Sequence, residues 1–407
     1  MKIITTLLLI SLSIGANAQA WINQISGSTN PMLAGCFFLN DNLGYVSGMG
    51  GEILKTSNGG STWNTLASGT TQDLYSLYFS SADTGYAVGN NSTVLKTING
   101  GTSWTTLNSG TTGIAFRNVS KFNGNQLYIV GAGGNIRKST NAGSTWTALN
   151  TGLTSQLYCV HFTDLNTGYA CGDGGKIIKT TNGGTTWTQL TTGTTIQLLY
   201  IQFIDANVGY ATGGNLGTGA GIVLKTTNGG TSWTQETFPS TYFGYLKFMN
   251  ANYGYIIGGD VSADTTKIYK TTNGGASWTI ESASSTRMYR GSFPGTTGYA
   301  VGTGGKIIKI SGLVGMSDIS SNEFNMNAFP NPFNNNIRIN FSLKKNEKIT
   351  IQLSNVLGEL VKIVPEKEYL IGENLIELDN LNELVAGQYF LTFKTEKSVE
   401  TTRIVKI

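Results

Sequence analysis

Histidine and cysteine, the side chains that most often carry protons or bind metals in sites, are rare in this 407-residue chain. The single histidine is His161, so a Ser/His/Asp triad would have to be built around it. It stands in an apolar run, and the same position in other copies of a repeat described below holds Tyr78, Gln202 or Lys247. One histidine and three cysteines at unrelated spacings give no zinc-type pattern. We therefore predict no catalytic residues, no metal and no cofactor.

Hydrolysis of a glycan is an alternative with weaker support. It needs two carboxylates that face each other across a cleft. Residues 1–312 contain eleven Asp and Glu, most of them isolated turn residues such as Asp83 and Asp164. A sialidase-type site also needs three clustered arginines, and the four available are scattered: Arg117, Arg137, Arg287 and Arg290. The Phe116-Arg117 pair is similar to the sialidase Phe-Arg-Ile-Pro element but lacks its proline.

Binding is better supported than catalysis. Arginine and tyrosine gather in short stretches that vary between copies of the repeat, whereas the rest of each copy is nearly constant. Variable loops on a rigid scaffold are where recognition tends to lie. Arginine forms bidentate bonds to anions and tyrosine stacks on sugars, so the ligand would be anionic or sugar-like. The predicted ligand-binding residues are Asp73, Arg117, Tyr242, Arg287, Tyr289 and Arg290.

The repeat that would position these residues is centred on Asn182-Gly183-Gly184 and the tryptophan that follows, Trp187. An Asn-Gly pair between β-branched runs is a strong hairpin signal, because both residues tolerate φ > 0. From Trp21 onward, successive tryptophans are 42, 41, 42, 41, 46 and 45 residues apart. A period of roughly 40–50 residues built from short strands indicates a propeller or a solenoid.

The ends of the repeat decide between these two folds. Each copy holds four short strands, and the second and third strands occur seven times. The last copy, 298–312, has no tryptophan strand after it, whereas Trp21-Ile22-Asn23-Gln24 is a tryptophan strand without the other three. A closed circle of sheets can take its missing strand from the other terminus. We therefore predict an all-β fold, a seven-bladed β-propeller closed by its N-terminal strand, which lies beside Lys306–Ile310.

The constant residues of the repeat are expected to be structural. The asparagine of each turn, such as Asn182, should accept backbone N–H bonds. The tryptophans should pack between blades, with each indole N–H bonded to one acceptor. The third strand of every copy carries one lysine, which we expect to lay its stem on the nearby tryptophan and keep its ammonium in water. These lysines are Lys55, Lys96, Lys138, Lys179, Lys225, Lys270 and Lys309.

The N-terminal segment and the cysteines indicate export. Residues 1–18 have a basic start, an apolar run and a small-x-small ending, as in a signal peptide, and the run is too short to span a membrane stably. No other transmembrane candidate exists, and no basic run indicates nucleic acid. Cys159 and Cys171 flank one turn and are expected to face each other, either as a disulfide or as two buried thiols.

After residue 312 the repeat stops and the composition changes. Residues 313–326 are predicted to be a linker. Beyond them come alternating strand-like runs separated by polar turns, which favour a small antiparallel β-sandwich over 327–407. The expected strands are Ile337–Leu343, Ile349–Leu353, Leu360–Ile363, Asn374–Leu378, Gln388–Lys394 and Thr401–Ile407.

Two families resemble parts of the chain. The repeat, with Gly85-Tyr86-Ala87-Val88-Gly89 and Thr227-Asn228-Gly229-Gly230-Thr231-Ser232-Trp233, resembles the Ycf48-like group of BNR (Asp-box) repeats over nearly all of residues 21–312, within the predicted propeller domain 19–312. Residues 327–407 resemble a type A sorting domain of the type IX secretion system, through Phe329-Pro330-Asn331-Pro332-Phe333 and Gly387-Gln388-Tyr389-Phe390-Leu391. The second resemblance implies a Gram-negative bacterium, delivery through the type IX machinery and removal of this domain afterwards.

We therefore expect a secreted protein, at the outer cell surface or released, whose propeller binds a glycan or a protein ligand. A glycan-degrading hydrolase and a structural surface-coat component are the alternatives. Nucleic acid is not an expected partner. A photosystem role does not transfer with the Ycf48-like repeat, since a repeat of this kind is a folding unit on which unrelated functions are built.

Overall fold

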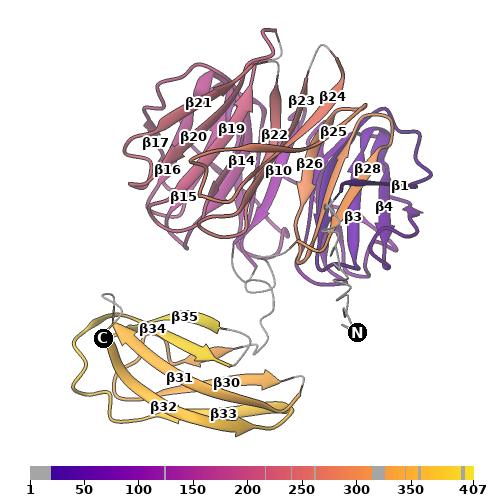
Figure 1. Ribbon diagram of the computed structural model, residues 1–407. Coiled ribbons are helices and arrows are strands. Elements are labelled where there is room, and N and C mark those ends of the chain that lie inside the picture. Colours follow the sequence, from indigo (N-terminus) through magenta and orange to yellow (C-terminus); the bar gives the residue numbers. More distant parts are fainter. Residues whose placement is uncertain are drawn as a thin grey trace, which may run out of the picture.

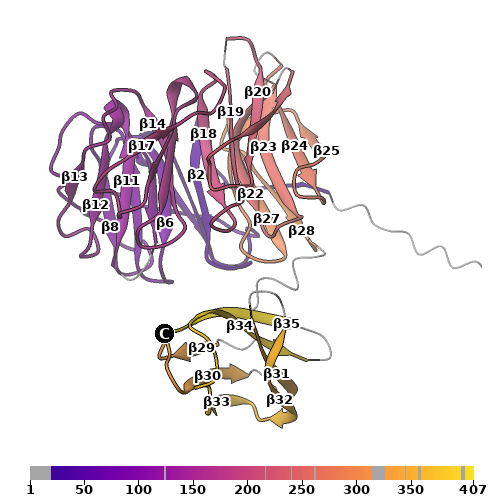
Figure 2. The ribbon, with the colours of Figure 1, turned by 90° about the vertical axis from the view of Figure 1, so that its left-hand side faces the viewer.

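The computed structural model describes residues 20–407 except 123–124, 216, 240, 261–262, 314–325, 344, 356–358 and 396–398. Figures 1 and 2 show a large group of β-sheets formed by the first three quarters of the chain and a smaller sandwich formed by the rest. The only helical elements of the described residues are short 3-10 turns, and none is long and apolar enough to cross a membrane. The predicted leader, 1–18, and most of the predicted linker lie outside the described residues.

Among the described residues, strands β1 to β28 form seven separate four-stranded sheets, and no sheet closes on itself. In every sheet the strand that comes first in the repeat is the innermost. These innermost strands are Leu33–Phe38 (β2), Leu74–Phe79 (β6), Phe116–Lys121 (β10), Leu157–Phe162 (β14), Leu198–Phe203 (β18), Tyr242–Phe248 (β22) and Met288–Ser292 (β26).

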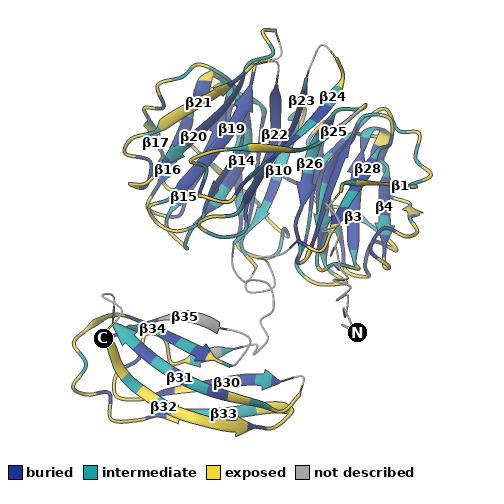
Figure 3. Cartoon of the chain, in the orientation of Figure 1, coloured by how far each residue is buried: buried dark blue, intermediate teal, exposed yellow. Residues whose placement is uncertain are grey.

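The second strand of each sheet is almost entirely buried, as the dark strands of Figure 3 show. The second strands are Gly44–Gly48 (β3), Gly85–Gly89 (β7), Leu127–Gly131 (β11), Gly168–Gly172 (β15), Gly209–Gly214 (β19), Gly254–Asp260 (β23) and Thr297–Gly302 (β27). The third strands are Ile53–Thr56 (β4), Val94–Thr97 (β8), Ile136–Ser139 (β12), Ile177–Thr180 (β16), Gly221–Thr226 (β20), Thr265–Thr271 (β24) and Ile307–Ser311 (β28).

The outer strands are short and mostly exposed. Six of them follow their own third strand in sequence: Asn64–Leu66 (β5), Thr105–Thr106 (β9), Thr147–Leu149 (β13), Thr188–Leu190 (β17), Thr234–Phe238 (β21) and Thr279–Ser284 (β25). The seventh is Ile22–Gln24 (β1), which pairs antiparallel with β28 in the register Ile22 with Lys309 and Gln24 with Ile307. Three short 3-10 turns complete this region: Met49–Gly51 (η1), Ala132–Gly134 (η2) and Asp173–Gly175 (η3).

Each innermost strand contacts the innermost strand of the next sheet, and β26 contacts β2. Between the third and outer strands of six sheets lies the predicted turn. In that turn the asparagine accepts the expected backbone bond, for example from Thr186 N to Asn182 Oδ1 at 2.9 Å. Positive φ falls on the two residues after the asparagine, such as Gly183 (67°) and Gly184 (94°), rather than on the asparagine itself. Two consecutive residues with positive φ explain why glycine is used there.

The tryptophans pack between sheets, as predicted: Trp104, for example, lies in a cluster with Tyr45 and Ile53 of the preceding sheet. Six of the seven also contact the phenylalanine that follows or ends the innermost strand of their own sheet. Trp104 meets Phe79 edge to face with ring centroids 5.9 Å apart, and Trp21 meets Phe293 in the same way at 6.1 Å.

The tryptophan rings are half-buried, and the seven indole Nε1 atoms have no hydrogen-bond partner among the described residues. The prediction of one acceptor per indole is therefore wrong. In the ring of Trp104, for example, Nε1 lies between the Phe79 ring and Gly101 of its own turn, which offer it no acceptor.

The repeated lysines are structural, but the predicted partner is wrong. Each Nζ lies 5.2–5.7 Å from the ring centroid of the tyrosine on the adjacent second strand, not on the tryptophan. The tyrosine hydroxyl and the lysine ammonium then donate to one carbonyl oxygen in the turn of the next sheet. Tyr169 and Lys179 both donate to Gly229 O, at 3.1 and 2.9 Å. We call this arrangement the tyrosine–lysine joint.

The joint recurs between the last sheet and the first, where Tyr299 and Lys309 donate to Gly59 O at 3.1 and 2.8 Å. One copy differs. The sheet after Tyr255 and Lys270 has β1 as its outer strand, and no Asn-Gly-Gly turn precedes β1. There the Glu281 carboxylate receives both donors, with the Lys270 ammonium 3.0 Å away. Glu281 is in β25 of the same sheet, so within the described part of the chain this copy satisfies its two donors without a bond to the next sheet.

The cysteines are thiols in this structure. Cys159 and Cys171 face each other across the β14–β15 pair, as predicted, and Cys36, Cys159 and Cys171 are all free. Burial raises the pKa of the Cys159 thiol to about 11. Both thiols of the pair are buried. The sequence left a disulfide and two buried thiols open, and the structure contains the two thiols.

Residues 326–407 form a two-sheet sandwich, as the sequence predicts. One sheet orders β29-β30-β33 and the other β32-β31-β34-β35. Their facing sides enclose an apolar core that includes Phe333, Phe341 and Phe393. The strands are Asn327–Phe329 (β29), Ile337–Leu343 (β30), Glu347–Asn355 (β31), Leu360–Tyr369 (β32), Gly372–Leu378 (β33), Gly387–Lys394 (β34) and Val399–Lys406 (β35).

The role of the N-terminal strand gives a testable prediction. Trp21 contacts Tyr255 and Phe293 edge to face, whereas its neighbour Ile22 is 64% exposed. Trp21→Ala should lower the free energy of unfolding by about 2–3 kcal/mol, the lower end for a large aromatic because the ring is half-buried. Ile22→Ala should change it by less than about 0.5 kcal/mol. Urea unfolding of the two variants measures both values, and equal effects would contradict the packing described here.

Candidate functional site

Every innermost strand carries an irregularity at the same place. The pairing with the second strand slips by one residue near the start of each innermost strand, for example between Phe116 and Asn118 in β10 and between Phe243 and Tyr245 in β22. A bulge of this kind re-aims the extra side chain. The bulged residues are Ala34, Tyr75, Arg117, Tyr158, Leu199, Gly244 and Tyr289.

These seven residues line one cavity of about 130 Å³ together with Met32, Tyr242 and Arg290. We call it the mouth cavity. All seven innermost strands contribute to its wall, so the cavity lies where they converge. Its polar groups are two guanidiniums and four tyrosine hydroxyls, and none of its lining residues is a carboxylate. The wall therefore offers donors for an anionic or hydroxyl-rich group and flat rings for stacking.

Arg117 is the most distinctive residue of the mouth cavity. Its guanidinium carbon lies 4.2 Å from the centroid of the Tyr75 ring, a close cation–π contact. Its Nε is buried and has no hydrogen-bond partner among the described residues. Buried donors are normally satisfied, so a lone N–H in the wall of a cavity marks a place where a ligand acceptor would fit.

The tyrosines of the cavity are held neutral. Burial raises the pKa of Tyr242 to about 12. Burial also raises the pKa of Tyr158, and the Asp173 carboxylate in η3 adds to that shift. Tyr75 and Tyr289 shift in the same direction, again mainly through burial. At neutral pH all four hydroxyls can therefore donate hydrogen bonds.

Four of the six residues predicted to bind a ligand line this cavity: Arg117, Tyr242, Tyr289 and Arg290. Arg290 donates to the carbonyl oxygens of Gly244 and Tyr289, so its guanidinium is already partly engaged. Their role in binding stays a prediction.

The other two predicted residues lie behind the lining. Asp73 accepts bonds from Gly50 N at 2.9 Å and from the Tyr75 hydroxyl at 3.4 Å. Arg287 pairs with Asp264 at 3.1 Å and lies 5.8 Å from the centroid of the Tyr289 ring. Both support a lining tyrosine instead of lining the cavity.

Tyr75 and Tyr158 are lining residues that our sequence analysis missed. The available signal was the second residue of each innermost strand. Aligning the seven strands at that position would have picked out Tyr75, Arg117, Tyr158 and Tyr289 together.

A second cavity of about 400 Å³, the channel cavity, lies along the same innermost strands. Tyr75 and Arg290 line both cavities. His161 lines the channel cavity, and its Nε2 is 3.1 Å from the carbonyl oxygen of Phe203, so the neutral ring donates from Nε2. Burial, reinforced by the nearby Lys247 ammonium, lowers the pKa of His161 to about 4.

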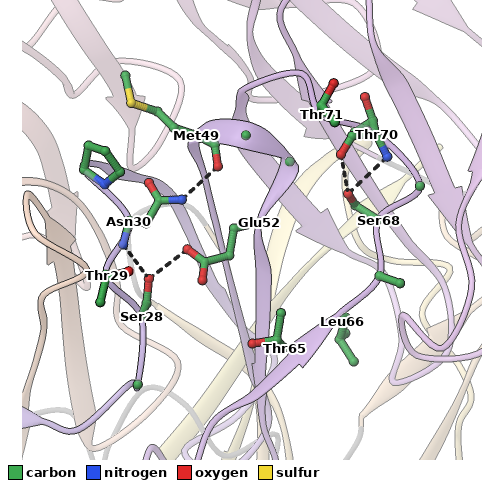
Figure 4. A pocket seen from close by; sticks show the side chains of 16 residues that line it. Ser28, Thr29, Asn30, Met49, Glu52, Thr65, Leu66, Ser68, Thr70 and Thr71 are labelled. Atoms are coloured by element: carbon green, nitrogen blue, oxygen red, sulfur yellow. Dashed lines mark hydrogen bonds between the residues drawn. The ribbon is translucent and has the colours of Figure 1, made fainter.

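An open groove of about 1000 Å³, drawn in Figure 4, is lined by the connection before β2, by η1 and by the end of β5 with the connection after it. Its polar groups bond to one another: Ser28 Oγ donates to Glu52 at 2.8 Å and Asn30 Nδ2 to Met49 O at 2.8 Å. A similar groove of about 580 Å³ recurs at Gly174–Thr195. Glu52 is the one carboxylate among the lining residues, so this groove lacks the carboxylate pair of a glycosidase.

No cluster of three or more His, Cys, Asp or Glu with metal-binding geometry occurs in the described part of the chain.

The sheets and the sorting-type sandwich define a class: an all-β protein of the β-propeller type with a C-terminal secretion domain. Two family models match the sequence. One, described as photosynthesis system II assembly factor YCF48, matches residues 61–152 and 144–313, and the chain belongs to that family. The other, described as a secretion system C-terminal sorting domain, matches residues 327–407. That tail marks a secreted, cell-surface protein of the type IX pathway.

Solved structures share the fold. A structure of YCF48 bound to D1 peptide has a TM-score of 0.58 and 19% identity, covering 72% of this chain and 97% of that one. PorZ, a surface component of the type IX secretion system of Porphyromonas gingivalis, has a TM-score of 0.51 and 10% identity, covering 94% of this chain and 60% of that one. A GH74 xyloglucanase from Xanthomonas campestris has a TM-score of 0.56 and 12% identity, covering 94% of this chain and 75% of that one. No curated protein sequence gives a significant match.

The burial of His161 predicts a pH-dependent stability. Its folded-state pKa, about 4, lies below the ordinary value of 6.5, so the unfolded chain binds a proton first as pH falls. The stability that this neutral ring contributes is present above pH 6.5 and lost by about pH 4, a change on the order of 2–3 kcal/mol.

His161→Gln should abolish that part of the pH dependence and still fold, because Gln202 occupies the same position in the next sheet and bonds to Phe248 N and O. Urea unfolding at pH 7 and pH 4.5, in chloride, gives the difference between the two proteins. An identical loss of stability in both would contradict the assigned environment of His161.

Proposed function

We propose that the seven sheets are the seven blades of one closed propeller, with β1 as the outer strand of the last blade. The support comes from contacts between the two ends of the repeat region. β1 pairs with β28, the Phe38 and Tyr299 rings stack with centroids 3.6 Å apart, and Asp41 accepts a bond from Thr297 at 2.6 Å. Closure of this kind leaves no exposed seam between the first and last blades.

The proposed domains follow the same division. Residues 1–18 are a signal peptide, 19–312 the propeller, 313–326 a linker and 327–407 the sorting domain. The sorting domain is proposed to engage the type IX machinery of a Gram-negative bacterium. The propeller is thereby left at the outer surface or released.

The propeller is proposed to act there as a binding module for a glycan or protein ligand, not as an enzyme. The observation that carries this proposal is the mouth cavity, where arginine and tyrosine converge and the buried Arg117 Nε has no partner among the described residues. Loops and strand ends on a rigid scaffold suit recognition. Asp73 and Arg287 are proposed to contribute by orienting Tyr75 and Tyr289.

Peptide and sugar ligands both fit this chemistry. The similarity to a YCF48 structure with a bound D1 peptide supports a peptide, because a carboxylate or backbone carbonyl could accept from Arg117. The four tyrosine rings support a sugar, which stacks on aromatic faces. A role in photosystem assembly is not proposed, since the sorting domain directs this chain out of the cell.

A glycan hydrolase is the second candidate, favoured by the similarity to the xyloglucanase. It is placed second because the mouth cavity has no carboxylate in its lining and the groove of Figure 4 has one. A reducing-end assay on xyloglucan and on sialylated glycans tests it directly: sustained product release would replace the binding proposal. A structural coat role remains the third alternative.

The binding proposal predicts the effect of one conservative change. Screening the purified full chain on a glycan array and a peptide array should give at least one ligand. Arg117→Lys keeps the charge but loses the Nε donor and the planar contact with Tyr75, so affinity for that ligand should fall at least tenfold, or about 1.4 kcal/mol.

The matched control is Arg338→Lys, an exposed arginine in β30 that pairs with Glu377. It should leave affinity unchanged. No hit on either array, or a hit that Arg117→Lys binds as well as the original chain does, would overturn the assignment of the mouth cavity.

A further inference from the structure

The channel cavity has a one-sided charge. Its lining includes Lys121, Lys247 and Arg290, with His161 beside them, and none of the lining residues is Asp or Glu. Serine, asparagine and tyrosine side chains make up much of the remaining polar surface, among them Ser76, Asn118 and Tyr200. The cavity therefore offers donors and positive charge to whatever occupies it.

Lys247 differs from its counterparts in three other sheets. At the equivalent position, His161 bonds to Phe203 O and Gln202 to Phe248 N and O, while Ser292 Oγ accepts a bond from Phe38 N, each in the next sheet. Lys247 has no hydrogen bond or ion pair with the described residues, and neither has Lys121. Both side chains are half-buried and both line the cavity.

An ammonium group that is partly removed from water and has no counter-ion is costly to hold in a fold. Desolvation does lower the pKa of Lys247. A bound anion would offset that cost, because the attraction between opposite charges strengthens as water is excluded. The absence of carboxylates from the lining means that no side chain there performs this role.

We propose that the channel cavity is a binding site for a small oxyanion such as inorganic phosphate or sulfate. The Lys247 ammonium is the main contact, and Lys121 and the donors of Ser76, Asn118 and Tyr200 surround it. A volume of about 400 Å³ holds a tetrahedral oxyanion with room to spare. This site would bind a different ligand from the mouth cavity, and its main contact, Lys247, does not line the mouth cavity. The proposal therefore does not rest on the proposed function.

The single histidine makes the site easy to observe. His161 is the only histidine of the chain, so [13C]histidine labelling of untagged protein gives one imidazole signal from inside the cavity. An anion next to Lys247 favours the imidazolium form. Titration with phosphate should therefore give a saturable shift of this signal, and the pKa of His161 should rise by at least about one unit. Sodium chloride at the same ionic strength is the reference.

Lys247→Gln should abolish the saturable shift. It is expected to fold, since glutamine already occupies this position in the preceding sheet as Gln202, and thermal melting checks that it does. The control is Lys176→Gln, which removes a lysine that bonds to Ser155 Oγ outside the cavity; its titration should match that of the original chain. The proposal is overturned if phosphate moves the His161 signal no more than chloride does, or if folded Lys247→Gln still saturates.

Discussion

The tyrosine–lysine joint is the interaction on which the rest of this structure depends. A short four-stranded sheet cannot bury both of its faces alone, so each sheet must be fixed to the next. The joint does this by directing a neutral hydroxyl and an ammonium from one sheet to a single turn carbonyl of its neighbour, as Tyr169 and Lys179 do with Gly229. The same lysine lies over the tyrosine ring, so its charge is partly balanced without a carboxylate. Where the turn is missing, Glu281 of the same sheet accepts both bonds, so among the described residues that copy makes no bond to the neighbouring sheet.

Fixing the sheets to one another also fixes the geometry at the centre. With neighbouring innermost strands in contact, the bulge in each strand directs its extra side chain into the mouth cavity. The positions farther along the same strands face the channel cavity or bond to the next sheet. The scaffold residues therefore repeat almost unchanged, while the residues that line the two cavities are free to differ. Arg117 and Lys247 are each found at one such position, and each lacks the partner that its burial would ordinarily require.

Much of the fold could be predicted because its signals are local. The Gly-Gly turns and the alternating runs give the second strands nearly to the residue, as with Gly168–Gly172. The side-chain partners between sheets were harder to predict, because the direction of the Lys179 side chain depends on how two sheets pack against each other. The candidate site was predicted in part: Arg117 and Tyr289 stand out by type, whereas Tyr75 and Tyr158 look like strand residues. Only the bulge turns them toward the mouth, and simple two-residue alternation does not reveal a bulge.

The central claim is that the joint between the last and first sheets is equivalent to the interior joints. The direct measurement compares Tyr299→Phe/Lys309→Met with Tyr169→Phe/Lys179→Met by urea unfolding and hydrogen exchange. The account predicts that each pair costs about 2–3 kcal/mol and exposes both flanking sheets to exchange. If the circle is closed, these two joints have the same partners and geometry, so the two values should agree within about 0.5 kcal/mol. A negligible effect of the Tyr299/Lys309 pair, with the interior pair costing its full amount, would contradict closure and the shared cavities built on it.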